Sequence, residues 1–235
     1  MMKSSELESK INKLKLTGIN LELLEDNKVR IGLINKSIKK LIIPEGARTL
    51  GISTDYHPFS NSVPEIETIV LPDSLEVIEE DTFAFFEHLK EVKFPKELKI
   101  IGQSAFYNCT KLEKVEFNSS LKLIGYMAFR DCAIKGTVKF PESLLRIGDC
   151  AFSYNDKIEG LDFSEYKHLE YLGDRAFVDC KNLEDTLGFP FSLALKSGSY
   201  RVLDGCSKLK DPILRGFATG IYGDLTEKVS EFEAV

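Results

Sequence analysis

The hydrophobic positions of this chain recur every 23 residues through its centre. One column is phenylalanine, at Phe83, Phe106, Phe129 and Phe152, with Phe177 following after 25 residues. A second column is aliphatic and lies five residues earlier, at Ile78, Ile101, Ile124, Ile147 and Leu172. A fixed period of this length is typical of repeats that cannot bury a core alone and share one with their neighbours. The pattern therefore predicts one elongated domain of stacked turns.

Each repeat also carries a Val-x-Phe alternation, as at Val92 and Phe94 and again at Val115 and Phe117. Such alternation predicts a short strand with two side chains directed to the core. One strand cannot pair within its own repeat, so we expect it to pair in parallel with the next repeat's strand, about 4.8 Å away. The residue after the aliphatic column indicates a positive φ or a close approach of two backbone segments, because it is glycine in four repeats: Gly102, Gly125, Gly148 and Gly173.

The columns combine into Ile-Gly-x-x-Ala-Phe-x-x-Cys-x-x-Leu-x-x-Val-x-Phe, which runs from Ile101 in one repeat and from Ile124 in the next. This pattern resembles the BspA-like leucine-rich repeat family over residues 66–193, which hold five repeats. The resemblance implies a leucine-rich repeat solenoid, a right-handed curved coil of short parallel strands. It implies one strand per 23-residue turn, irregular or short helical outer segments, and terminal caps. It also implies a protein-interaction role, with many members at bacterial or protist cell surfaces.

Four parts of the chain are distinguished by how well they follow the repeat. Residues 1–37 are expected to form an N-terminal cap, with a short helix and a hairpin. Residues 38–65 hold a degenerate first repeat with a loop insertion, and residues 66–193 hold the five leucine-rich repeats. Residues 194–235 combine a degenerate last repeat with a C-terminal cap, in which Asp224–Phe232 is expected to form a short helix with Asp224 as its N-cap.

Charge and hydropathy narrow the classes of partner. The formal net charge is −6, which is the wrong sign for a nucleic-acid-binding surface. No run of 18 or more apolar residues predicts membrane insertion. The N-terminal segment lacks the apolar core of a secretory signal. We therefore expect a cytoplasmic protein if the chain is complete, and a secreted or cell-surface protein if a signal has been removed.

The sequence contains no recognisable catalytic or cofactor motif. Its five cysteines do not form Cys-x-x-Cys pairs, and its three histidines are far apart, so no metal site and no cofactor are predicted. Four cysteines, Cys109, Cys132, Cys180 and Cys206, share one repeat column in which Asn155 also stands. We interpret that column as core filling by free thiols, with Asn155 making a hydrogen bond to loop backbone. The prediction is a protein that is not an enzyme; a carbohydrate-active β-helix enzyme is the disfavoured alternative.

The outward residues of the strands are the first candidate binding surface. In one column they are Lys93, Glu116, Lys139 and Asp162, so the sign of the charge alternates from turn to turn. Opposite charges on neighbouring strands stabilise a sheet by about 0.2–1 kcal/mol per pair. The column is therefore either a ladder that only compensates its own charge, or a mixed-charge recognition surface on the concave face of the solenoid. A polyanionic ligand fits it poorly, because the charges give no strong net field.

Two further segments are candidates. The insertion at residues 52–64 offers Tyr56, His57 and Phe59 as anchors for a partner, or is a variable loop whose Phe59 fills a core position. The strip formed by Val77, Ile100 and Leu123 is either an exposed apolar contact or a second, half-buried strand ladder.

From these patterns we expect a non-catalytic protein–protein interaction scaffold that binds through the concave sheet or the variable loops. The alternative is an adhesin-like fragment of a cell-surface protein. The sequence does not identify the partner or the oligomeric state.

Overall fold

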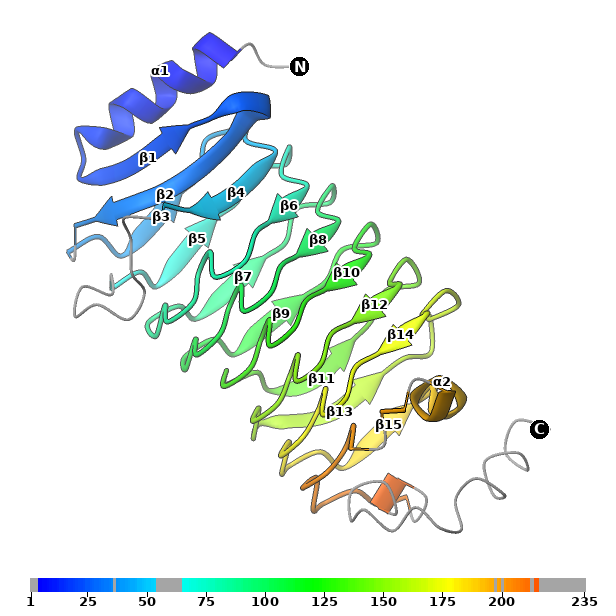
Figure 1. Ribbon diagram of the computed structural model, residues 1–235. Coiled ribbons are helices and arrows are strands. Elements are labelled where there is room, and N and C mark those ends of the chain that lie inside the picture. The colour runs from blue at the N-terminus through cyan, green and yellow to red at the C-terminus, as the bar shows by residue number, and fades with distance from the viewer. Residues whose placement is uncertain are drawn as a thin grey trace.

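The computed structural model describes residues 4–35, 37–53, 65–196, 198–199, 201–211 and 214–215. Stacked turns form one elongated coil that runs from the N-terminal helix to the C-terminal end (Figure 1). Two walls of parallel strands run along the coil, and a third wall of turns joins them. The hydrophobic columns lie between these walls, and this confirms the solenoid that the 23-residue period predicts.

A helix and a hairpin stand at the N-terminal end. Helix α1 (Ser4–Lys15) buries Leu7 and Ile11. It packs along β1 (Ile19–Leu23), which pairs antiparallel with β2 (Lys28–Ile34) across the short turn η1 (Glu25–Asn27). Strand β2 then pairs in parallel with the first turn of the coil. The hairpin therefore extends the coil and gives α1 a surface on which to bury its apolar side.

The first wall is a sheet of eight strands in the order β1-β2-β4-β6-β8-β10-β12-β14, here called the long sheet. Beyond the hairpin it takes one short strand from each turn. These strands are β4 (Thr49–Ile52), β6 (Val77–Ile78), β8 (Ile100–Ile101), β10 (Leu123–Ile124), β12 (Arg146–Ile147) and β14 (Tyr171–Leu172).

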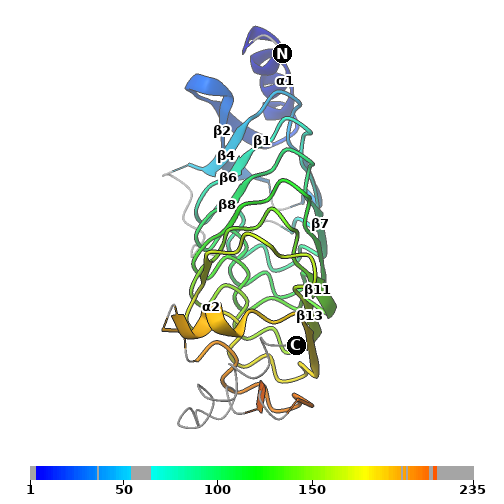
Figure 2. The same cartoon turned by 90° about the vertical axis from the view of Figure 1, so that its right-hand side faces the viewer.

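The second wall contains the Val-x-Phe strands, on the opposite side of the coil from the long sheet (Figure 2). It consists of a four-stranded and a three-stranded sheet. The first sheet holds β3 (Lys40–Ile42), β5 (Thr68–Val70), β7 (Glu91–Lys93) and β9 (Lys114–Glu116). The second holds β11 (Gly136–Lys139), β13 (Ile158–Asp162) and β15 (Asp185–Leu187), after which helix α2 (Phe191–Lys196) follows.

The expectation of one strand per turn is wrong, because each complete turn contributes a strand to both walls. The missed strand ends at the aliphatic column, where Leu123 and Ile124 pair with Ile100 and Ile101. Buried backbone groups need hydrogen-bond partners, and the neighbouring turn supplies them. Two residues are too few to show an alternating pattern in the sequence.

The third wall, here called the turn wall, consists of residues 79–86, 102–109, 125–132, 148–155 and 173–180. Its backbone N–H groups donate to the next turn: Ser104 to the Tyr126 oxygen at 2.8 Å, and Asn108 to the Arg130 oxygen at 2.9 Å. Two residues per turn adopt a positive φ, as at Ser104 (49°) and Asn108 (56°). The segments expected to be irregular are therefore a regular ladder of backbone hydrogen bonds.

The glycine column reflects close approach rather than a positive φ. A Cβ atom on Gly125 would lie 2.6 Å from the Gln103 nitrogen and from the Gly102 carbonyl carbon. Gly148 repeats this geometry against the preceding turn, and none of the column's glycines has a positive φ. The absence of a side chain is what allows successive turns to stack here.

The domain expected over residues 1–37 contains the helix and hairpin described above. In the expected degenerate first repeat, β3 and β4 pair with β5 and β6 of the next turn. The helix expected over Asp224–Phe232 lies outside the described residues.

The two reasons for a glycine can be separated by substitution. Gly125→Asn should lower the free energy of unfolding by about 1–3 kcal/mol, because its side chain has no space. Gly136 has a positive φ of 72° and nothing within 4 Å of a Cβ atom. Asparagine tolerates that backbone conformation, so Gly136→Asn should cost less than about 1 kcal/mol. Urea unfolding measures both; equal losses at the two positions would contradict the close-approach argument.

Met127 adopts a φ of 53° although it is neither glycine nor asparagine. A left-handed conformation costs an ordinary residue about 1–2 kcal/mol, and asparagine tolerates it better. Met127→Asn should therefore unfold at a higher temperature than Met127→Ala, which loses the same side-chain contacts but keeps the strain. Thermal unfolding followed by circular dichroism is the measurement, and an alanine variant at least as stable as the asparagine variant would refute the prediction.

Candidate functional site

The outward side chains of the Val-x-Phe strands form a surface that we call the ladder face. Val92 and Val138 point into the core at the centre of their strands, so the residues on either side point outward. The upper column of the ladder face is Ile42, Val70, Lys93, Glu116, Lys139, Asp162 and Leu187. The lower column is Lys40, Thr68, Glu91, Lys114, Thr137, Gly160 and Asp185.

Strand register aligns the predicted site residues as neighbours. Lys93 lies opposite Glu116 on β7 and β9, and Lys139 lies opposite Asp162 on β11 and β13. The four residues that the sequence singled out therefore stand in one column. A break between the two sheets separates Glu116 from Lys139.

Ion pairs neutralise only part of this column. Lys139 Nζ lies 3.2 Å from a Glu165 oxygen and 3.7 Å from an Asp162 oxygen. Lys114 Nζ lies 2.6 Å from a Glu116 oxygen on its own strand. Among the described residues, Lys93 has no carboxylate oxygen within 4.0 Å. The predicted pairing between neighbouring strands thus forms at Lys139, whereas Glu116 pairs along its strand.

The electrostatics follow these contacts. The hydrogen bond from Lys114 lowers the pKa of Glu116. The hydrogen bond to Glu165 raises the pKa of Lys139. Hydrogen bonds from Ser164, with a smaller contribution from Lys139, lower the pKa of Asp162. Each of these groups is therefore held in its charged form at neutral pH, and none is tuned for proton transfer.

Both ends of the upper column are apolar and exposed. Ile42 and Val70 are 44% and 39% exposed at one end, and Leu187 is 60% exposed at the other. Sequence reasoning missed this feature, because Ile42 stands in the aliphatic run Leu41-Ile42-Ile43 and Leu187 follows a lapse in the 23-residue period. The available signal was an aliphatic residue at an outward strand position.

The cysteine column fills the core, as predicted. The Cys109 and Cys132 thiols donate to the carbonyl oxygens of Phe83 and Phe106 in the preceding turn, at 3.2 and 3.1 Å. Asn155 takes the same place, and its amide donates to the Phe129 oxygen at 2.8 Å. The expected hydrogen bond of Asn155 to loop backbone is therefore confirmed.

The thiols are unsuited to nucleophilic chemistry. All five cysteines are free, and four of them are buried. Burial, with the neighbouring thiol adding to it, raises the pKa of Cys109 and of Cys180 well above the usual range. A reactive cysteine needs the opposite shift, toward the thiolate.

The other candidate segments differ in outcome. Val77, Ile100 and Leu123 begin β6, β8 and β10 of the long sheet. Val77 and Leu123 are half-buried and Ile100 is only marginally exposed, which favours the interpretation as a second strand ladder. Tyr56, His57 and Phe59 lie outside the described residues.

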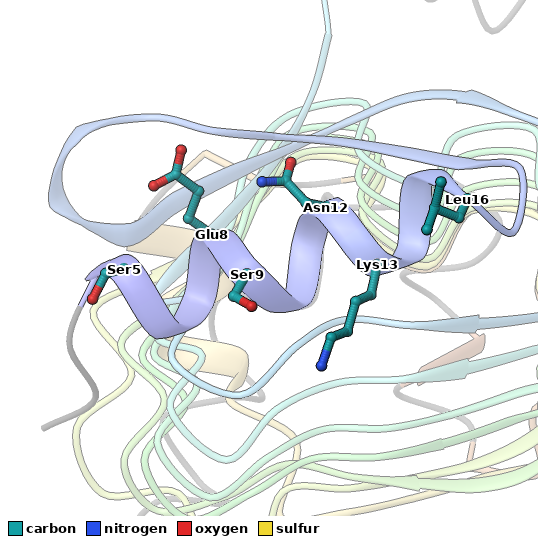
Figure 3. Close-up of a pocket in the computed structure, with 6 residues that line it drawn as sticks. All are labelled: Ser5, Glu8, Ser9, Asn12, Lys13 and Leu16. Carbon is teal, nitrogen blue, oxygen red and sulfur yellow. The ribbon is translucent and has the colours of Figure 1, made fainter.

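Two surface depressions lack the features of a catalytic site. One lies along the outer side of α1, where the side chains of Glu8 and Lys13 diverge from the helix instead of converging (Figure 3). The other is lined by Arg48 and Glu76, and their charges are already engaged, since Arg48 and Lys99 both pair with Glu76. No group of three or more potential metal-ligating side chains occurs within the described residues. No helix in that part of the chain is long and apolar enough to cross a membrane.

Comparison with known proteins identifies the family. The family described as BspA type leucine rich repeat region matches residues 53–184 in six copies. The chain therefore belongs to the BspA-type leucine-rich repeat family. A search of the curated proteins finds no match.

Solved structures show the same fold. A leucine-rich repeat protein of T. pallidum shares 21% identity, with a TM-score of 0.51, over 85% of this chain and 91% of that one. A leucine-rich cell surface protein from Faecalibacterium prausnitzii shares 14% identity, with a TM-score of 0.33, over 82% and 80% of the two chains. The pneumococcal vaccine antigen PcpA shares 18% identity, with a TM-score of 0.38, over 72% and 67%.

Substitution at Asn155 tests the role of the cysteine column. Asn155→Ala should lower the free energy of unfolding by at least about 2 kcal/mol, because it leaves the buried Phe129 carbonyl without its donor. Asn155→Cys should cost less than half as much, since cysteines at this place donate to the equivalent carbonyl. Urea unfolding of both variants decides; a cysteine variant as unstable as the alanine variant would argue against the shared role.

Proposed function

We propose that this protein is a non-catalytic scaffold that binds another protein through the ladder face. The observation that carries the proposal is the exposure of this surface over a core that is fully packed beneath it. Lys93, Glu116 and Lys139 are exposed, whereas Val92 and Val138 beneath them are buried. A partner can therefore contact these side chains without disturbing the core.

The composition of the ladder face fits a protein partner. Its centre carries lysines and acids in alternation, and its ends carry exposed aliphatic side chains. Protein interfaces combine apolar contacts with polar and charged groups that fix register. A partner of complementary character has an alternating charge pattern flanked by apolar side chains.

The long sheet is less suited to this role. Its corresponding positions are half-buried at Val77 and Leu123. Further along, the Arg146 guanidinium lies 4.4 Å from the centre of the Tyr171 ring, whose hydroxyl donates to Asp149. These groups already contact one another, so the ladder face has more side chains available to a partner.

The double variant Lys93→Glu/Lys139→Glu tests the proposal. Reversing two charges on the ladder face should weaken binding of a partner at least about 10-fold, because each reversal places like charges in contact. The partner is first recovered by affinity capture with the wild-type protein. It is then purified and titrated against each variant by isothermal calorimetry.

The matched control is Lys111→Glu/Lys122→Glu, which makes the same change of net charge away from the ladder face. This control should bind like the wild type. Equal weakening by both double variants would show a non-specific charge effect, and unchanged binding by the ladder-face variant would remove that face from consideration.

A further inference from the structure

The upper column of the ladder face has complementary halves. Its midpoint lies between Glu116 on β9 and Lys139 on β11. One step from the midpoint, glutamate is matched by lysine, and two steps away Lys93 is matched by Asp162. Three steps away, the exposed Val70 is matched by the exposed Leu187. Each position thus meets its complement when the column is read in the opposite direction.

From this symmetry, we infer that the ladder face binds a second copy of this chain. The two copies lie face to face with their coils antiparallel, related by a two-fold axis that runs parallel to the strands between β9 and β11. Isologous interfaces of this kind place residue i against residue j and j against i. The inference rests on the proposed function and names its partner.

The charge pattern selects one register. An axis through Glu116 would place Lys93 against Lys139 of the second copy, and Glu116 against itself. An axis through Lys139 would place Glu116 against Asp162, and Lys139 against itself. Only the axis between them pairs opposite charges at both charged steps and brings Val70 onto Leu187. Like charges in contact across an interface cost several kcal/mol, so they exclude the shifted registers.

The lower column is compatible with that register. Lys114 faces Thr137, Glu91 faces Gly160, and Thr68 faces Asp185 of the second copy. None of these contacts joins like charges. At the axis, Glu116 and Lys139 have side chains that are 64% and 62% exposed, so both reach the facing copy. Asp162 is more covered, at 14%, but the exposed Glu165 lies beside it on Lys139.

The size of the surface makes the association weak. Seven strands about 4.8 Å apart, with three residues of about 3.3 Å each, give an area of about 300 Å² per copy. A standard interface buries about 800 Å² per partner. The dimer therefore belongs to the weak, transient class, and its charge pairs make it sensitive to salt.

Two single variants and their mixture test the dimer. Glu116→Lys places lysine against Lys139 of the second copy, and Lys139→Glu places glutamate against Glu116. Each variant alone should dissociate at least about 10-fold more readily than the wild type. In an equimolar mixture, each lysine of one variant meets a glutamate of the other, so the mixture should associate at least as well as the wild type.

Sedimentation velocity at low salt, from about 1 µM to about 1 mM, covers the range of weak affinities. Lys111→Glu, which lies off the ladder face, should associate like the wild type. A wild type that stays monomeric throughout, or a mixture no more associated than its components, would overturn the dimer. Either result leaves the proposed function intact, since that is decided separately by the Lys93→Glu/Lys139→Glu variant and a different protein.

Discussion

The stacking of one phenylalanine ring per turn sets the spacing on which the whole coil depends. Rings of consecutive turns lie 5.2 Å apart from Phe83 to Phe106, 5.2 Å from Phe106 to Phe129, and 5.2 Å from Phe129 to Phe152. This spacing is close to the separation of hydrogen-bonded strands, about 4.8 Å. The rings, the two strand walls and the turn wall therefore share one repeat distance. A turn can satisfy its backbone and bury its side chains only against a neighbour built in the same way.

The columns most constrained by this spacing were also the most readable in the sequence. The phenylalanine and aliphatic columns predicted the buried core, and the mixed charges of Lys93 and Glu116 were assigned to facing positions. The two-residue strands of the long sheet were missed, because their pairing depends on the neighbouring turn and leaves no alternation of their own. The positive φ at Met127 was equally hidden, since backbone hydrogen bonds to adjacent turns override its local preference.

Functional residues follow a different logic from core residues. The core columns repeat because each turn solves the same packing problem, whereas outward positions are free to differ. The ladder face differs in an ordered way, with apolar ends and an alternating centre. Its apolar ends could not be recognised from the sequence, because an exposed isoleucine such as Ile42 reads as core when it stands between two buried neighbours. Exposure became visible only once the strand register was known.

The turn wall gives the molecule an electrical direction along its length. Its N–H groups at Ser104, Phe106 and Asn108 all donate to carbonyl oxygens of the following turn. Each of these peptide groups carries a dipole of about 3.5 D, and dipoles aligned head to tail add together, as they do in an α-helix. In this wall the addition proceeds turn by turn, with the negative pole toward the N-terminal end and the positive pole toward the C-terminal end. Each further repeat lengthens the array, so a longer coil built on the same turn becomes more strongly polarised whatever side chains it displays.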